Sequence, residues 1–207
     1  MLSLLQTDYI DIYLIHWPDV NTPLEETADT LKELKKAGKI RFSGISNFED
    51  NDLEKLYDLD VLDVIQFPYS MVNRSQEQLL KKYHEKGVAT MGYGSLGAGI
   101  LTGSIRELPH FEPGDARLGF YDFFVEPKFS RVMELLEVLD DIALKRQVPV
   151  AQVTINWTVQ HNFINTSLTG VRNAREAVEN TAAMAWKLTA DEIHKIDQAV
   201  AQLDSLS

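Results

Sequence analysis

Apolar side chains recur along the chain in two alternating patterns, one typical of β-strands and one typical of amphipathic helices. A β-rich apolar run at residues 10–16 is followed by residues 24–37, where leucine and alanine recur at helical spacing as far as Gly38. The same order returns twice, with strands predicted at 41–46 and 61–70 and helices at 49–59 and 75–87. Strands that alternate with helices in this way predict parallel pairing.

The second half of the chain continues the alternation and then becomes mainly helical. We predict strands at 88–93 and 163–170, a long loop at about 104–127, and helices at 130–147, 149–160, 173–186 and 189–203. Asn173 and Thr189 are the expected N-caps of the last two helices. Five strands suit an open doubly wound sheet or part of a (β/α)8 barrel, but they cannot close an eight-stranded barrel.

Polar side chains stand at the carboxyl ends of three predicted strands, which is where parallel α/β folds place their ligand sites. They are His16, Ser46 with Asn47, and Gln66. By strand alternation His16 shares a face with the apolar residues of its strand. Each residue also has a purely structural interpretation: His16 as a buried hydrogen-bonding group, Ser46 and Asn47 as helix caps, and Trp17 as core. Together they favour a polar pocket.

A glycine-rich stretch follows the fourth predicted strand. Gly92, Gly94 and Gly97 match G-x-G-x-x-G formally, but we reject a dinucleotide fingerprint because more glycines follow where that motif would open a helix. The glycines would still let backbone approach a bound group, and Tyr93 offers a flat ring for stacking. A flexible turn is the alternative interpretation.

The fifth predicted strand leads through Gly170 to a helix start flanked by Arg172 and Arg175. Free backbone amides, the helix dipole and arginine side chains together make an anion site. An ordinary capped helix with solvated arginines is the alternative.

The amino-acid composition disfavours several classes of protein but does not identify one function. Of the 207 residues 44% are hydrophobic, which is ordinary for a folded protein, and a net charge of -11 disfavours nucleic acid and anionic membranes as partners. Cysteine is absent and no apolar run approaches the roughly 18 residues of a membrane span, so we expect a cytoplasmic location. No metal-binding histidine spacing, nucleophile elbow or Walker loop is present.

Five segments, taken in order, resemble the aldo-keto reductases: LQTDYIDIYLIHWPD, GKIRFSGISNF, IQFPYSMVNR, YGSLGAGILTG and GVRNAREAVENT. The resemblance covers essentially the whole chain. It implies an α/β fold, part of a (β/α)8 TIM barrel with about five of eight strand-helix units and extra C-terminal helices. It also implies NADP(H)-dependent reduction of aldehydes or ketones, with NAD(H) not excluded.

The same resemblance assigns roles to particular residues. His16 would orient the substrate carbonyl in catalysis, and Trp17 would bind the substrate. The expected cofactor contacts are Ser46, Asn47, Gln66, Tyr93, Gly94, Ser95, Leu96, Gly97, Gly170, Val171, Arg172, Glu179 and Asn180. Two positions depart from the family pattern: Thr169 stands where proline is usual, and Glu176 where glutamine or arginine is usual. A carboxylate near a phosphate is unfavourable, which weakens the expectation of NADP(H) over NAD(H).

In the family pattern three further strand-helix units, which carry the catalytic aspartate, tyrosine and lysine, come before the matching segments, and we expect this chain to lack them. We therefore expect residues 1–207 to be one N-terminally truncated domain with impaired activity towards a small carbonyl substrate. Tyr13 cannot replace the acid, because it has the opposite strand parity to His16. The alternatives are a non-catalytic NADP(H)-binding or interaction protein and an inactive truncated product. We also expect self-association through open barrel edges, and neither nucleic-acid nor membrane partners.

Overall fold

The structure, a computed structural model, describes residues 2–115 and 117–204, without the side chains of residues 118 and 204. The chain forms two compact units, and each is described by itself. The first contains the residues up to Phe67, together with Gln76–Gly92 and Phe163–Thr166. The second contains Pro68–Ser75, Tyr93–Asn162 and the residues from Ser167 onward.

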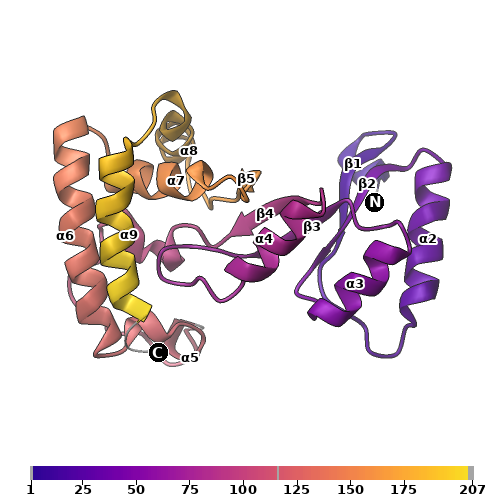
Figure 1. The fold of residues 1–207 in the computed structure, drawn as a ribbon, viewed down its shortest axis with the longest axis horizontal. Helices are drawn as coiled ribbons and strands as arrows, with labels where there is room; N and C mark the ends of the chain where they lie inside the picture. Colours follow the sequence, from indigo (N-terminus) through magenta and orange to yellow (C-terminus); the bar gives the residue numbers. More distant parts are fainter. Residues whose placement is uncertain (1, 116, 205–207) are drawn as a thin grey trace. The chain divides into compact units, whose positions relative to one another are not determined.

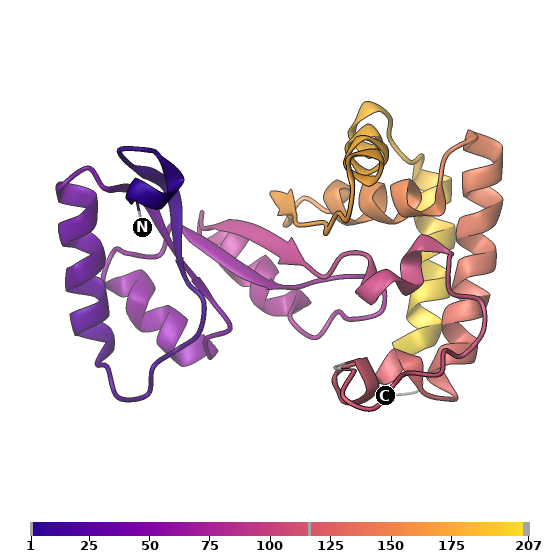
Figure 2. The ribbon, with the colours of Figure 1, turned by 180° about the vertical axis from the view of Figure 1, so that it is seen from behind.

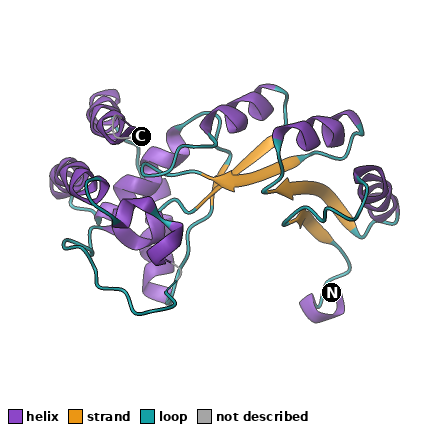
Figure 3. Cartoon of the chain, turned by 90° about the horizontal axis from the view of Figure 1, so that it is seen from below, coloured by secondary structure: helices purple, strands orange, loops and turns teal. Residues whose placement is uncertain are grey.

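The first unit is built around the sheet, whose strands are drawn in orange in Figure 3. Its strands follow the order β1-β2-β3-β4-β5. Their bounds are β1 Ile10–Ile15, β2 Ile40–Ser46, β3 Val64–Pro68, β4 Ala89–Tyr93 and β5 Thr166–Ser167, and the helices of this unit are α1 Leu2–Leu5, α2 Leu24–Lys36, α3 Asp50–Asp58 and α4 Glu77–Glu85. Helices α2 and α3 lie side by side (Figure 1). The end residues of β3, β4 and β5 fall in the second unit.

The two faces of this sheet differ in burial. Strands β1 and β2 pair in parallel, as do β2 and β3, and the register sets Ile12 beside Phe42 and Ser46 beside Gln66. Ile45 and Ile65 are fully buried on one face. On the other face Ile12 is 40% exposed and Phe42 is 44% exposed. Because side chains alternate along a strand, His16, Ser46 and Gln66 have the parity of the more open face.

The second unit is mainly helical. Its elements are η1 Gly97–Thr102, α5 Arg117–Phe120, η2 Asp122–Phe124, α6 Lys128–Arg146, α7 Val150–Gln160, α8 Ala174–Thr181, η3 Ala182–Ala185 and α9 Ala190–Asp204. Helices α6 and α9 lie side by side, as Figure 2 shows from behind. Helix α7 is buried from Gln152 to Thr158. None of the described helices has the length and apolarity that a membrane span requires.

The buried polar side chains of α7 connect the helices of this unit. The Asn156 amide donates to the backbone carbonyls of Ala183 (2.9 Å) and Trp186 (2.7 Å), and its oxygen accepts from the Leu188 amide. Thr154 Oγ1 donates to the Leu101 carbonyl at 2.9 Å. These bonds satisfy polar groups that would otherwise cost free energy inside the core.

The strand-helix order predicted from the sequence is confirmed, and so are both helix caps. The Asn173 side chain accepts from the Glu176 amide, and Thr189 exchanges hydrogen bonds with Glu192. The fifth strand is only Thr166–Ser167, shorter than the predicted 163–170, and the expected loop at 104–127 contains α5 and η2. Elements this short are set by packing, and their sequences are too short to show a periodic pattern of apolar residues.

Candidate active site

The polar residues at the strand ends of the first unit form one connected group. Asn47 Nδ2 donates to the His16 backbone carbonyl at 2.9 Å and lies 3.0 Å from Ser46 Oγ. Ser46 Oγ in turn donates to the Gln66 backbone carbonyl at 2.9 Å. The structure therefore brings together the ends of three neighbouring strands, as the sequence predicts.

Asn47 can make these bonds because its backbone is left-handed, with φ of 61°. Asparagine tolerates this region better than other residues that carry a side chain. The conformation turns the chain away from β2 directly after Ser46. The Asn47 amide consequently points back across the sheet to β1.

His16 is exposed at the end of β1, with its ring edge-on to the Trp17 ring at 5.8 Å between centroids. Trp17 is 60% exposed. Among the residues that the structure describes, neither a tyrosine nor a lysine hydrogen-bonds to the His16 imidazole. Tyr13 pairs in register with Ser43, which has the parity of the buried face. His16 thus has a polar neighbourhood, and within the described part of the chain no tyrosine hydroxyl or lysine amine donates to its imidazole.

The glycine-rich stretch is a tight turn in the second unit. The Gly97 amide donates to the Gly94 carbonyl at 2.8 Å, and both residues have positive φ, 71° at Gly94 and 55° at Gly97. A Cβ at Gly97 would lie 2.8 Å from Val72 Cγ2 and would force that side chain to shift, and the positive φ also favours glycine. A 3₁₀ helix follows, with left-handed backbone at Ala98 and Gly99. An α-helix, which a dinucleotide fingerprint requires, does not begin there.

The residues around this turn differ in exposure. Ser95 is buried, and its hydroxyl lies 2.6 Å from the Ser167 hydroxyl, which connects the turn to the segment leading into α8. Leu96 is half-buried. Burial raises the pKa of the Tyr93 phenol, and Tyr121 adds to this effect. A raised pKa makes Tyr93 a poor acid, and its flat ring is the part available for stacking.

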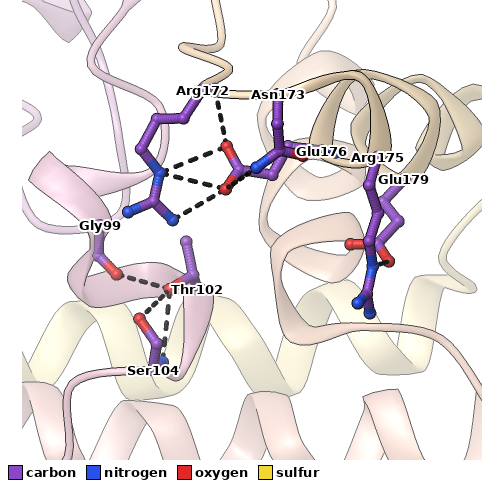
Figure 4. A network of polar contacts seen from close by, with 8 residues as sticks. All are labelled: Gly99, Thr102, Ser104, Arg172, Asn173, Arg175, Glu176 and Glu179. Atoms are coloured by element: carbon purple, nitrogen blue, oxygen red, sulfur yellow. Dashed lines mark hydrogen bonds and ion pairs between the residues drawn. The ribbon is translucent and has the colours of Figure 1, made fainter.

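At the start of α8, Arg172 Nε and Nη2 both donate to Glu176 Oε1 (Figure 4). The Arg172 backbone amide and its Nη2 each donate to the Glu176 carboxylate at 2.8 Å. The Arg172 guanidinium, followed by its backbone amide, lowers the pKa of the Glu176 carboxyl. Gly170 and Val171 before them are exposed.

One turn further along α8, Arg175 Nε donates to Glu179 at 2.7 Å (Figure 4). The backbone carbonyl of Glu179 accepts from the buried Gln152 side chain at 2.8 Å, and Asn180 beside it is half-buried. Sequence reasoning missed both ion pairs and Gln152. The Arg-to-Glu spacing of four residues was the available signal for the pairs, whereas nothing in the local pattern marked Gln152.

The predicted site residues therefore form two groups, one in each unit. His16, Trp17, Ser46, Asn47 and Gln66 lie at the strand ends of the first unit. The residues from Tyr93 to Gly97 and from Gly170 to Asn180 belong to the second unit. In the described part of the chain there is no cluster of three or more acidic or histidine side chains that could hold a metal ion.

Comparison with known proteins assigns the chain to a family. The sequence model of the Aldo/keto reductase family matches residues 1–201, and the chain belongs to this family. It is 34% identical over 193 residues to Aldo-keto reductase YhdN of Bacillus subtilis (strain 168). It is 32% identical over 192 residues to the NADH-specific methylglyoxal reductase of Escherichia coli (strain K12). These matches cover 92% and 91% of this chain and 58% of each relative.

Solved structures of the family have the same fold. Glycerol dehydrogenase AKR11B4 from Gluconobacter oxydans is similar with a TM-score of 0.89 and 29% identity, over 97% of this chain and 61% of that one. An aldo/keto reductase from Klebsiella pneumoniae, solved in complex with NADP and acetate, has a TM-score of 0.71 and 26% identity, over 95% and 61%. The expected fold class, part of an aldo-keto reductase barrel, is therefore confirmed.

Proposed function

We propose that this chain provides the nicotinamide-binding part of an oxidoreductase that reduces aldehydes or ketones. The observation that carries the proposal is the hydrogen-bonded group of His16, Asn47, Ser46 and Gln66 in a member of the aldo-keto reductase family. The bound dinucleotide would supply the hydride that adds to the carbonyl carbon, while a proton goes to the carbonyl oxygen. We further propose that residues 1–207 belong to one aldo-keto reductase domain.

The residues present fit such a cofactor. Gln66 is half-buried and has the parity of the open sheet face, where its side-chain amide can both donate to and accept from a carboxamide. The turn at Gly94–Gly97 has no side chain at two of its four positions, which lets backbone approach a pyrophosphate. Tyr93 would stack on the ring. NADP(H) is the cofactor that the resemblance implies, with NAD(H) as the second choice.

His16 would hold the substrate rather than protonate it. A neutral imidazole can donate one hydrogen bond to the carbonyl oxygen and so align it for hydride addition. Reduction also needs an acid within hydrogen-bond reach of that oxygen. Tyr13 has the wrong parity, and the raised pKa of Tyr93 disfavours proton release. We therefore propose that residues 1–207 on their own turn over poorly.

The test is to purify the 207-residue chain, measure NADPH and NADH binding by calorimetry, and then follow cofactor oxidation with 4-nitrobenzaldehyde. We expect binding and little turnover. Robust turnover would contradict the proposal that residues 1–207 lack the acid that protonates the carbonyl oxygen. Absence of cofactor binding would overturn the proposed function. The variant Gln66→Ala should bind the cofactor more weakly without loss of fold, which circular dichroism would check.

A non-catalytic dinucleotide-binding or interaction protein is the second candidate. It is favoured by the exposed His16, which lacks a hydrogen-bonded acid in the described part of the chain, and by the exposed pair Ile12 and Phe42. Binding of the dinucleotide with no turnover at any substrate concentration would support it. If His16→Ala keeps both cofactor binding and activity, this histidine has no catalytic role.

A further inference from the structure

The glycine-rich segment, residues 93–103, contains backbone conformations that need support from outside it. Ala98 has a φ of 51°, and Gly99 beside it has a φ of 96°. Ala98 carries a side chain, and the left-handed region is unfavourable for such residues. Conformations of this kind persist where the surrounding structure holds them. The contacts that fix this segment therefore matter for the proposed cofactor site.

The middle of the segment is held by the helical core of the second unit. Leu101 is fully buried, and its backbone carbonyl accepts from Thr154 Oγ1 of α7 at 2.9 Å. Thr102 Oγ1 donates to the Gly99 carbonyl at 2.7 Å (Figure 4). These contacts fix the segment as far as Thr102.

The end of the segment is held by Arg106 and Asp140. Arg106 Nε donates to the Gly103 carbonyl at 2.6 Å. Its Nη1 and Nη2 donate to the two carboxylate oxygens of Asp140, at 2.8 and 2.7 Å. Asp140 lies in α6, 34 positions further along the chain. One guanidinium thus connects the end of the segment to a helix, with the defined geometry of two parallel hydrogen bonds.

The arrangement depends on glycine at position 103 and contributes little to global stability. A Cβ at Gly103 would lie 2.7 Å from Arg106 Nη2, and the φ of Gly103 is 76°. The lack of a side chain there lets the guanidinium lie against the backbone. The side chains of Arg106 and Asp140 are each 43% exposed, and exposed ion pairs stabilise a fold only slightly. The effect of this pair is therefore local.

We propose that Arg106 and Asp140 are positioning residues that hold the glycine-rich segment in its cofactor-binding conformation before the dinucleotide arrives. This inference rests on the proposed function, in which the turn at Gly94–Gly97 approaches the pyrophosphate. Arg106 and Asp140 act through the backbone of the segment. A segment that is ordered in advance binds more tightly, because less conformational entropy is lost on binding.

Positioning and simple charge effects predict opposite results for a change at Asp140. The dinucleotide is an anion, so removal of a carboxylate tightens binding if that carboxylate acts through its charge alone. Removal of Asp140 weakens binding if its role is to hold Arg106. Alanine is a suitable replacement within α6, because it is the best helix former.

The experiment titrates the 207-residue chain and the variants Arg106→Ala, Asp140→Ala and the double variant with NADH and NADPH by calorimetry. We expect each single variant to bind the cofactors about five-fold more weakly. The double variant should bind no more weakly than either, because both residues act through one contact. Arg106→Lys keeps a charge that can pair with Asp140 and should recover part of the affinity. The midpoint of urea unfolding should stay close to that of wild type.

The matched control is Glu134→Ala, which removes the carboxylate of another exposed ion pair on α6. Glu134 pairs with Arg131 at 2.7 Å, so the variant makes the same change in net charge as Asp140→Ala. Its cofactor affinity should not fall. Unchanged or tighter binding in Asp140→Ala, or an additive loss in the double variant, would overturn the inference and leave the proposed function standing.

Amide hydrogen exchange of the free chain gives a readout that needs no cofactor. The amides of Gly99, Leu101 and Gly103 donate hydrogen bonds within the segment. Their exchange should be faster in Asp140→Ala than in wild type and unchanged in Glu134→Ala. Equal exchange in all three chains would overturn the inference. If exchange changes as expected but no chain binds either cofactor, the proposed function falls, and the inference falls with it.

Discussion

At the scale of single residues, Asn47 does most to order the strand-end group. It donates to the His16 carbonyl, 31 positions away along the chain, and lies within hydrogen-bond distance of Ser46. Its left-handed backbone is what lets one side chain reach both partners. Gly97 has a comparable role in the second unit, where its positive φ and its closeness to Val72 both favour glycine. Backbone conformation at two positions thus shapes the two groups of site residues.

We predict that Asn47→Ala destabilises the protein by about 3 kcal/mol. It removes the hydrogen bonds to the His16 carbonyl and to Ser46 Oγ, worth about 1 kcal/mol each, and it places alanine in a left-handed conformation that costs about 1 kcal/mol. The matched variant Asn47→Gly loses the same bonds without the strain, so its loss should be smaller by about 1 kcal/mol. Urea unfolding measures both. Equal losses in the two variants would show that backbone strain contributes nothing.

At the scale of elements, the ends of α6 and α9 are connected by an ion pair. Arg146 in the last turn of α6 donates through Nε to Glu192 at 2.9 Å, and Glu192 also caps α9 through Thr189. The Arg146 side chain is the main cause that lowers the pKa of the Glu192 carboxyl to about 2, and the Thr189 bonds add to it. The same two helices pack side by side.

This pair predicts a pH dependence of stability. The folded-state pKa of Glu192, about 2, lies below its ordinary value of 4.5, so the stabilisation is complete above 4.5 and is lost as the pH falls towards 2. Glu192→Gln should cost roughly 2 kcal/mol at neutral pH, because a charge-assisted contact is lost.

Denaturant unfolding of wild type and Glu192→Gln at pH values between neutral and acidic would show the free-energy difference shrinking over this window. A difference that stays constant with pH would contradict the assignment to Glu192. The control Glu134→Gln, an exposed pair on α6, should show a much smaller difference at every pH.

At the scale of the whole molecule, the sheet leaves apolar side chains in contact with solvent. Ile12 and Phe42 are register partners on the open face, and Tyr9 just before β1 is 43% exposed. In the described part of the chain β1 pairs only with β2. The backbone N–H and C=O groups on the outer edge of β1 can hydrogen-bond to a strand of another chain. Self-association is therefore our expectation for the isolated chain.

Sedimentation velocity tests this expectation over a range of protein concentrations. Wild type should form dimers or larger species, and Phe42→Lys should shift the distribution towards monomer because a charge on the open face opposes burial of that face against another chain. Leu144→Lys is the control, since Leu144 is 79% exposed and belongs to α6 in the second unit. A wild-type chain that sediments as a monodisperse monomer would contradict self-association.

The sequence alone predicts three features: the order of strands and helices, the caps at Asn173 and Thr189, and the polar residues at three strand ends. Each of these features depends on neighbouring residues and on periodicity. The hydrogen bonds from Asn47 to His16, from Ser95 to Ser167 and from Gln152 to the Glu179 carbonyl were decided only by tertiary structure. They join residues 27 to 72 positions apart. Local propensity cannot predict such contacts. They form only when the free energy gained by packing exceeds the entropy lost in closing long loops.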